Sequence, residues 1–279
     1  LSRSRDPQSV IQQARQLVAA GYKEIVLTGI HTGGYGDDLE NYRLSDLLWD
    51  LDKVEGLGRI RISSIEASQI DERMLDVLKN SSKMCRHFHI PLQAGSNEVL
   101  KRMRRKYTIE EFEHKIKMIR DFMPDVAITT DIIVGFPGET DELFREGFEA
   151  IKRIGFSEMH VFPYSKRSGT PAARMEDQVD EEVKHARVHE LIDLSEQMQL
   201  AYAEKFVGQV LDVIPEKDEK GTAGDGFVTG FSDNYLQIRF PGTPDLTGKI
   251  CRVKLTKADA NTCEGQLVRV LDDATQALA

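Results

Sequence analysis

The regular alternation of short apolar runs with amphipathic stretches over the first 165 residues constrains the fold most. The apolar runs have the length of buried strands, and their starts lie 28 to 39 residues apart. That spacing is typical of repeated βα units, which build parallel sheets. The candidate strands are residues 24–28, 59–65, 87–92, 126–134 and 158–162. We therefore expect an α/β fold in the form of a partial βα barrel.

The pattern opens with an amphipathic helix, which carries Val10, Ile11, Ala14 and Leu17 on one side. A βα barrel opens with a strand, so we expect the first strand of the barrel to be missing from this chain. The first residues also lack Met and an apolar signal core, so we expect the chain to be part of a longer one. A missing strand leaves an unpaired sheet edge, which predicts self-association at high concentration.

The period of the hydrophobic pattern changes after residue 208. Residues 177–206 predict one long helix, which Gly208 ends. Short alternating strands are then expected at residues 209–214, 226–231, 235–240, 249–255 and 266–271, with an exposed hairpin tip over 216–226. Five strands in so short a stretch indicate a small all-β barrel. The predicted domains are therefore residues 1–207 and residues 208–279.

Charge and composition exclude several classes of protein. No run approaches the roughly 18 apolar residues of a membrane helix. The net charge of −9 argues against a generic nucleic-acid coat, although residues 1–107 hold 17 basic and 14 acidic side chains. The cysteines Cys85, Cys251 and Cys263 are too widely spread for a zinc site, and three separate thiols suit a reducing, cytoplasmic compartment. We expect no membrane and no stable protein partner.

Basic side chains gather at one place in the basic third of the chain. An RNA partner would meet the run Lys101, Arg102, Arg104, Arg105 and Lys106. A solvated helix end explains the same run equally well.

Polar or glycine-rich loops follow the candidate strands. They are residues 28–36, 63–68, 93–96 and 135–140. Glycine permits close backbone approach, and free amides at a helix start favour an anion or a polar edge. The carboxyl ends of parallel strands share one rim, so these loops predict a binding site there. Plain βα turns without a ligand stay open as the alternative.

Two further segments carry polar side chains. His87 and His89 form an H-x-H pair on one strand face, but no third ligand is near in sequence, so we expect no metal there. After the last strand, Tyr164 could stack on a base, while Lys166 and Arg167 could meet phosphate. A solvated loop exit explains those two charges as well.

Taken together, the motifs resemble one family. HIPLQ followed by GS and KRMRRKYT, TDIIVGFPGET, and the pattern H-x-F-x-Y-S-x-R-x-G-T-x-A-A are similar to those of the radical S-adenosylmethionine methylthiotransferases. The resemblance covers residues 1–207, and the terminal strands resemble the RNA-binding TRAM domain of that family. The loop LTGIHTGGYG resembles the branch that modifies threonylcarbamoyladenosine at position 37 of tRNA, beside the anticodon.

The resemblance implies a (βα)6 partial barrel and radical methylthiolation at C2 of the adenine. The implied cofactors are S-adenosylmethionine and two 4Fe–4S clusters. S-adenosylmethionine would be held by the loop, strand-end and turn residues Gly29, Gly33, Gly34, Ser64, Glu66, Gln93, Ser96, Asp131, Gly135, Phe136, Pro137 and Tyr164.

The sequence departs from the family where the first cluster would bind. The C-x-x-x-C-x-x-C motif is absent, and we expect both the cluster ligands and the sulfur-donor domain to lie outside this chain, which alone would be inactive. Glu139 sits one residue late for the family pattern, so its role stays open. Alternatives are the isopentenyladenosine branch, the branch acting on a ribosomal-protein aspartate, and a non-catalytic RNA-binding module. An unrelated aldolase-like barrel would need a strand lysine that no candidate strand supplies.

Overall fold

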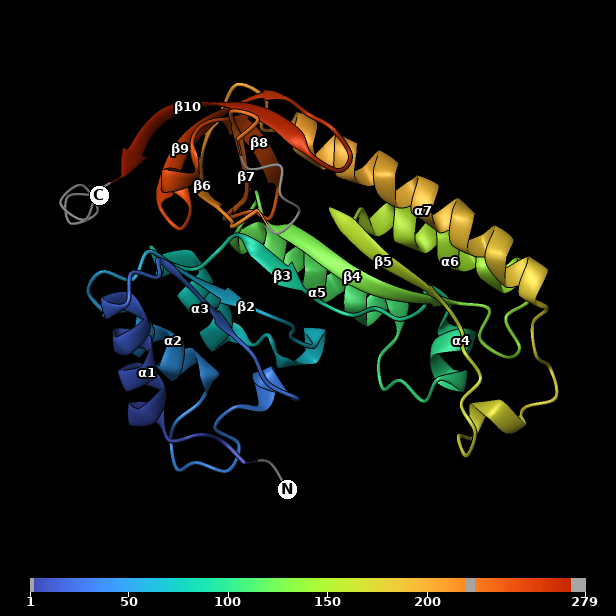
Figure 1. The fold of residues 1–279 in the computed structure, drawn as a ribbon. Helices are drawn as coiled ribbons and strands as arrows, with labels where there is room; N and C mark the ends of the chain where they lie inside the picture. The colour runs from blue at the N-terminus through green and yellow to red at the C-terminus, as the bar shows by residue number, and fades with distance from the viewer. Residues whose placement is uncertain (1–2, 219–223, 272–279) are drawn as a thin grey trace.

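The computed structural model describes residues 3–218 and 224–271, and its first part is an arc of parallel strands covered by helices (Figure 1). Residues 219–223 of the expected hairpin tip and residues 272–279 of the second expected domain lie outside this range. The strands of the arc are β1 (Glu24–Leu27), β2 (Arg59–Ile62), β3 (His87–His89), β4 (Ala127–Val134) and β5 (Glu158–Pro163).

The arc consists of two sheets that run on from one another. β1 pairs with β2, and β3, β4 and β5 pair in chain order, all in parallel. A parallel bridge between Ile60 and Met84 and a bond from Ile65 N to His89 O (3.0 Å) join β2 to β3. The parallel sheet and its strand order confirm the fold class expected from the spacing of the apolar runs.

Helices cover the convex side of the arc. They are α1 (Pro7–Ala19), α2 (Leu44–Asp52), α3 (Glu72–Asn80), α4 (Asn97–Arg102), α5 (Ile109–Phe122), α6 (Asp141–Ile154) and α7 (Glu181–Glu204). Alternate strand residues such as Phe88 and Ile62 point into the apolar core beneath these helices. Thr108 and Glu111 form the capping box that begins α5. α7 is shorter than the helix expected over residues 177–206.

The second part is a closed five-stranded barrel, which confirms the small barrel expected after residue 208. Its strands are β6 (Val210–Pro215), β7 (Phe227–Ser232), β8 (Gln237–Pro241), β9 (Ile250–Lys257) and β10 (Cys263–Leu271), in the closed order β10-β8-β7-β6-β9. Its core includes Val213, Ile238 and Phe240. The three cysteines are free and buried.

The small barrel docks on the amino ends of the parallel strands. Arg59 donates to the carbonyl oxygens of Asp212 (2.9 Å) and Phe231 (2.8 Å) in the small barrel. Burial disfavours ionisation of Glu24, yet Arg59 and Arg61 outweigh it and lower the pKa of that carboxyl. The barrel therefore blocks the amino end of the arc and leaves the carboxyl rim open.

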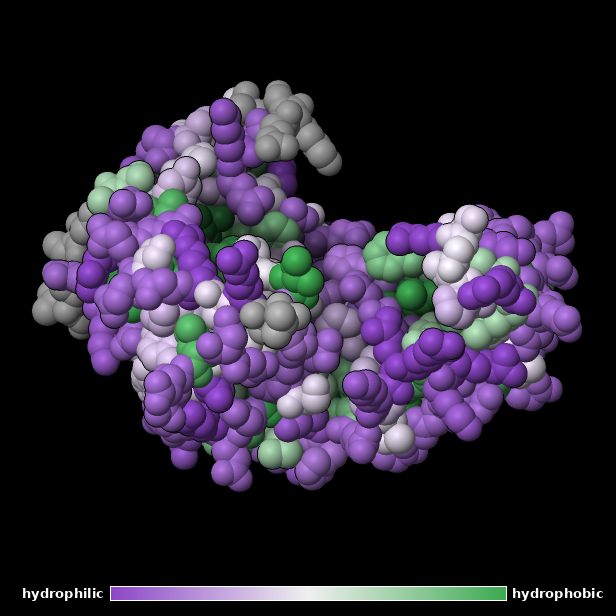
Figure 2. Space-filling model, turned by 90° about the horizontal axis from the view of Figure 1, so that it is seen from below, coloured by the Kyte–Doolittle hydropathy of each residue, from purple (hydrophilic) through white to green (hydrophobic). Residues whose placement is uncertain are grey.

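The concave side of the arc is also open. In Figure 1 β3, β4 and β5 lie in front of α5 and α6, with no helix over their near face. Figure 2 shows the molecule from below, where its outline is indented between a larger and a smaller lobe. A ligand can therefore approach the sheet from the rim and from the concave side.

Candidate functional site

The loops that follow the strands meet at one rim because all the strands of the arc are parallel. The loop after β1 contains the short helix η1 (Thr32–Gly34), and the loop after β2 contains η2 (Ala67–Gln69). The side chain of Gln69 lies 2.7 Å from Nε2 of His31, so these two loops touch. This contact brings together the first two of the four loops that the sequence places at one rim.

Two glycines of the loop after β1 are closely packed, one of them against the loop after β2. A Cβ atom on Gly33 would come 2.1 Å from Oε1 of Gln69, and one on Gly34 would come 2.3 Å from the ring of His31. Both glycines therefore permit close loop packing. Gly29 lies earlier in the same loop, is exposed, and would accept a Cβ in ordinary contact.

Gln93 is the residue of the rim with the least usual backbone. Its φ of 76° lies in the left-handed region that few non-glycine residues adopt. Its N–H donates to the carbonyl of Asp131 (2.9 Å), and its own carbonyl accepts from Ile133 (2.8 Å). Backbone held in this way often marks a functional position, because neighbouring structure must stabilise it.

The turn after β4 is held from behind by a buried ion pair. Gly135 has a φ of +70°, and its N–H donates to Oε1 of Glu139 (2.9 Å). The same oxygen accepts from Arg187 of α7 (2.9 Å), and both side chains are 6% exposed. Glu139, whose role the sequence left open, therefore braces the glycine turn from the side of the helices.

Lysine and aromatic side chains complete the support of this turn. A Cβ on Gly135 would lie 2.1 Å from Cγ of Lys184, whose ammonium donates to the carbonyl of Tyr164 (3.1 Å). The rings of Phe136 and Tyr164 meet edge to face, 5.3 Å apart. Pro137 is buried in the same turn.

Two rim hydroxyls fit a polar ligand. The side-chain oxygens of Ser96 and Tyr164 are buried and have no hydrogen-bond partner among the described residues. Buried polar groups are nearly always paired, so these two hydroxyls are candidates for contact with a polar ligand. Ser64 is half-buried, and Glu66 is exposed at the start of η2. The rim therefore presents several polar side chains to a ligand.

The basic side chains lie in α4 and in the segments that follow β3 and β5, with one difference among them. Arg102 is held by Asp177 (2.7 Å) and Glu98 (3.2 Å), and its guanidinium packs against Gly138, so it braces the rim. The others are exposed: Lys101, Arg104, Arg105, Lys106, Lys166 and Arg167. Only these exposed groups remain candidates for phosphate contact.

The concave side holds a polar cluster that the sequence did not reveal. His89, Asp131 and His160 bring ligand atoms within 4.8 Å of one another. Only His89 of the H-x-H pair belongs to this cluster, where it meets Asp131 (3.1 Å), whereas His87 bonds Arg61 and Thr129. His160 was missed because its partners come from other strands. The signal that could have found it is the period of two, which puts His160 and Phe162 on one face.

Comparison with known proteins agrees with this geometry. The family model for the radical SAM superfamily matches residues 1–151, more than half of the chain. The chain belongs to the radical SAM superfamily.

Two curated proteins show how this radical SAM chain compares with full-length relatives. Threonylcarbamoyladenosine tRNA methylthiotransferase MtaB of Bacillus subtilis (strain 168) is 57% identical over 274 residues, covering 98% of the chain and 61% of that protein. A tRNA-2-methylthio-N(6)-dimethylallyladenosine synthase of Thermoanaerobacter sp. (strain X514) is 40% identical over 270 residues, covering 96% and 57%. The chain thus spans about three fifths of these relatives.

A solved radical SAM structure shares the fold. Coproporphyrinogen III oxidase of Escherichia coli superposes with a TM-score of 0.52 at 15% identity, over 89% of this chain and 60% of that one. None of the helices among the described residues is long and apolar enough to span a bilayer.

The cysteines of this radical SAM chain do not fit an iron–sulfur cluster. Clusters are held by groups of thiolates. Cys85 lies beside Arg61 in the first part, whereas Cys251 and Cys263 lie in the small barrel, and all three are buried. Burial raises the pKa of the Cys85 thiol to about 12 and that of Cys251 to about 11, which keeps both protonated. These residues cannot assemble a cluster site.

Proposed function

We propose that this chain is the cofactor-binding and RNA-facing part of a tRNA methylthiotransferase that acts on N6-threonylcarbamoyladenosine. The observation that carries the proposal is the 57% identity, over almost the whole chain, with a relative of that name. The glycine-lined rim with two unpartnered hydroxyls supports it, because it suits a nucleoside cofactor. The whole protein would use S-adenosylmethionine and two 4Fe–4S clusters, with ligands outside these 279 residues.

The residues of the rim would bind and orient S-adenosylmethionine, which supplies the methyl group and the radical chemistry when bound. Ser96 and Tyr164 would give it their unpaired hydroxyls, and Gln93 would present its side chain from a fixed backbone. The turn at Gly135, braced by Glu139, would hold the carboxyl end of β4 in place beside that ligand. The remaining predicted contacts, Gly29 to Glu66 on the first two loops, would close the opposite side.

The RNA would reach the rim from the open side. The exposed cations of residues 101–106 and 166–167 lie at the end of α4 and in the loops after α4 and β5, next to the proposed cofactor site. Exposed cations beside a binding site contact the phosphates of a nucleic acid and orient its backbone without reading its sequence. The partner would be the anticodon loop of a tRNA.

A chimera tests the proposed function. The 274 aligned residues of the Bacillus subtilis relative are replaced by this chain and expressed in a strain that lacks that relative. Mass spectrometry of tRNA nucleosides is expected to show the methylthio derivative of threonylcarbamoyladenosine. A chimera that is folded and loaded with clusters but gives no product, while the intact relative does, would refute the proposal.

The same assay decides between branches. The 40% identity with dimethylallyladenosine synthases favours that substrate as the second candidate. A methylthio group found on dimethylallyladenosine instead would assign the chain to that branch. A chain that retains tRNA but restores no product in any chimera would be a non-catalytic RNA-binding module.

A further inference from the structure

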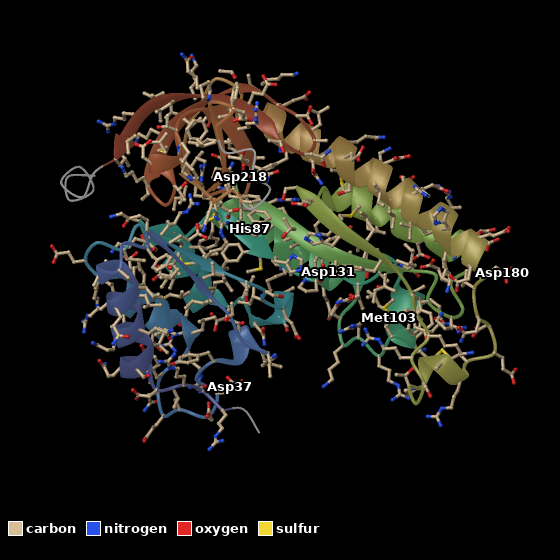
Figure 3. All side chains as sticks on the ribbon, viewed as in Figure 1. Asp37, His87, Met103, Asp131, Asp180 and Asp218 are labelled. Carbon is tan, nitrogen blue, oxygen red and sulfur yellow. The ribbon has the colours of Figure 1, made fainter. Side chains whose placement is uncertain are left out.

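A row of hydrogen bonds crosses the concave face of the arc, starting at the small barrel. Arg61 lies at the barrel and places Nη1 2.9 Å from Nδ1 of His87. A guanidinium only donates, so Nδ1 of His87 accepts and its proton sits on Nε2. Nε2 therefore donates to Oγ1 of Thr129 (2.9 Å). Figure 3 shows His87 where the sheet meets the small barrel and Asp131 further along the sheet.

The direction of this row fixes the state of the next two residues. Thr129 is 1% exposed, and its hydroxyl receives the proton of His87, so its own hydrogen is free to point to Nδ1 of His89 (2.9 Å). His89 then carries its proton on Nε2 and donates to Oδ2 of Asp131 (3.1 Å). This bond lowers the pKa of Asp131. Asp131 is thus held as an acceptor on the concave face, with its side chain 30% exposed.

Two unused rings stand beside this carboxylate. In the β4–β5 ladder His160 pairs with Asp131, and Phe162 pairs with Ile133. His160 is exposed, and Phe162 is 51% exposed on the same face. Large apolar side chains facing an open concavity are suited to stack on a flat ligand.

A metal ion is the competing occupant of His89, Asp131 and His160. A metal ion would need an unprotonated Nε2 on His89, whereas the row of hydrogen bonds places a proton on that nitrogen. Moving that proton to Nδ1 of His89 would point two N–H groups, one from each histidine, at the hydroxyl oxygen of Thr129. The hydroxyl hydrogen of Thr129 would then have no acceptor. The observed pattern therefore favours a ligand that donates N–H groups to Asp131.

We propose that Asp131, His160 and Phe162 form the seat of the target base of the RNA, a purine turned out of its loop. Its ring would stack against Phe162 and His160, and the N–H of its exocyclic nitrogen would donate to Asp131. This assigns Asp131 to the base and not to S-adenosylmethionine, where the resemblance placed it. The seat lies on the strands that lead to Gln93 and Gly135, so the base would face the rim where the cofactor is proposed to bind. This inference rests on the proposed function.

Binding of matched RNA hairpins tests the seat. One probe is an anticodon stem–loop with the threonylcarbamoyl-modified adenosine, and the other has an abasic site there. Fluorescence anisotropy at a single low salt concentration measures both, since phosphate contacts depend on salt. The wild-type chain is expected to prefer the intact loop by about tenfold, as stacking plus a charge-assisted hydrogen bond would give.

Variants assign that preference to the seat. Asp131→Asn keeps the shape but can turn a donor toward the base, and Phe162→Ala removes the ring. Both should lose the preference while binding the abasic loop as the wild type does. Asp193→Asn on the exposed side of α7 makes the same charge change and should keep it.

Three outcomes would overturn the inference. If Asp131→Asn and Phe162→Ala both keep the full preference, the base binds elsewhere, although the proposed function stands. If the preference needs added Zn²⁺ and disappears with a chelator, the cluster is a cation site. If the wild type binds neither RNA, the proposed function fails as well.

Discussion

Replacing Arg187 by Met tests whether the buried ion pair with Glu139 holds the rim together. Arg187 donates to the carbonyl of Glu139 (3.0 Å), to its carboxylate (2.9 Å) and to Asp141 (2.7 Å). Burial raises the pKa of Glu139, and Arg187 opposes that shift. Without Arg187, the carboxyl must take up a proton or stay charged with only the N–H of Gly135 for a partner.

The expected loss is large. Removing one partner of a buried ion pair costs about 3–5 kcal/mol, a substantial share of the 5–15 kcal/mol by which domains are stable. Equilibrium unfolding in urea, followed by circular dichroism, measures the change in the free energy of unfolding. The matched control is Arg145→Met, because Arg145 and Glu190 form an ion pair whose side chains are 55% and 41% exposed.

The control and a double variant sharpen the test. Arg145→Met should cost no more than about 1 kcal/mol. Combining Arg187→Met with Glu139→Gln should cost less than the sum of the two single changes, because the double variant leaves no buried charge unpaired. If Arg187→Met were no more destabilising than Arg145→Met, the argument that this pair braces the turn would be wrong.

Other changes have equally definite outcomes. Burial and Arg61 lower the pKa of His87 well below 6.5, so the unfolded chain takes up the proton first as the pH falls. The free energy of unfolding should therefore be fully retained above pH 6.5 and fall by up to about 1.4 kcal/mol per pH unit below it. Urea titrations at pH 7.5 and 5.5 would measure this loss, which should be smaller in His87→Gln. Gly135→Ala should lower the melting temperature more than Gly155→Ala, because both glycines have positive φ but of the two only Gly135 is crowded, by Lys184. Equal shifts in melting temperature would show that the contact with Lys184 does not require a glycine at residue 135. Arg59→Ala should expose the connection between α7 and β6 to limited proteolysis, whereas Arg252→Ala, in a half-exposed ion pair, should not.

The sequence predicted the strands well because burial under helices leaves a periodic pattern. The expected starts at residues 24, 59, 87 and 158 are those of β1, β2, β3 and β5. Strand ends were less accurate: β3 stops at His89, while Gln93 leaves the regular strand with its left-handed backbone. The local sequence pattern does not reveal such a turn, because the turn depends on neighbours that are far away in the sequence.

Buried charges were the part that the sequence could not show. Arg59, Arg61 and Arg187 look like surface residues in any window of the chain, yet all three are at most 7% exposed. Arg59 bonds a carbonyl 172 residues away, and Arg187 meets Glu139 48 residues away. Only the fold supplies these partners. The same holds for Asp131 and His160, which adjacent strands bring together.

The parallel strands form an open arc, since β5 has a strand partner on one side only among residues 3–218 and 224–271. A closed barrel admits ligands only through one of its ends, so a bulky polymer must insert a narrow protruding segment. An arc with a free flank can take a folded polymer sideways. For the RNA proposed as the partner, this free flank would let the folded molecule dock against the strands and leave intact, with one nucleotide rearranged in each round.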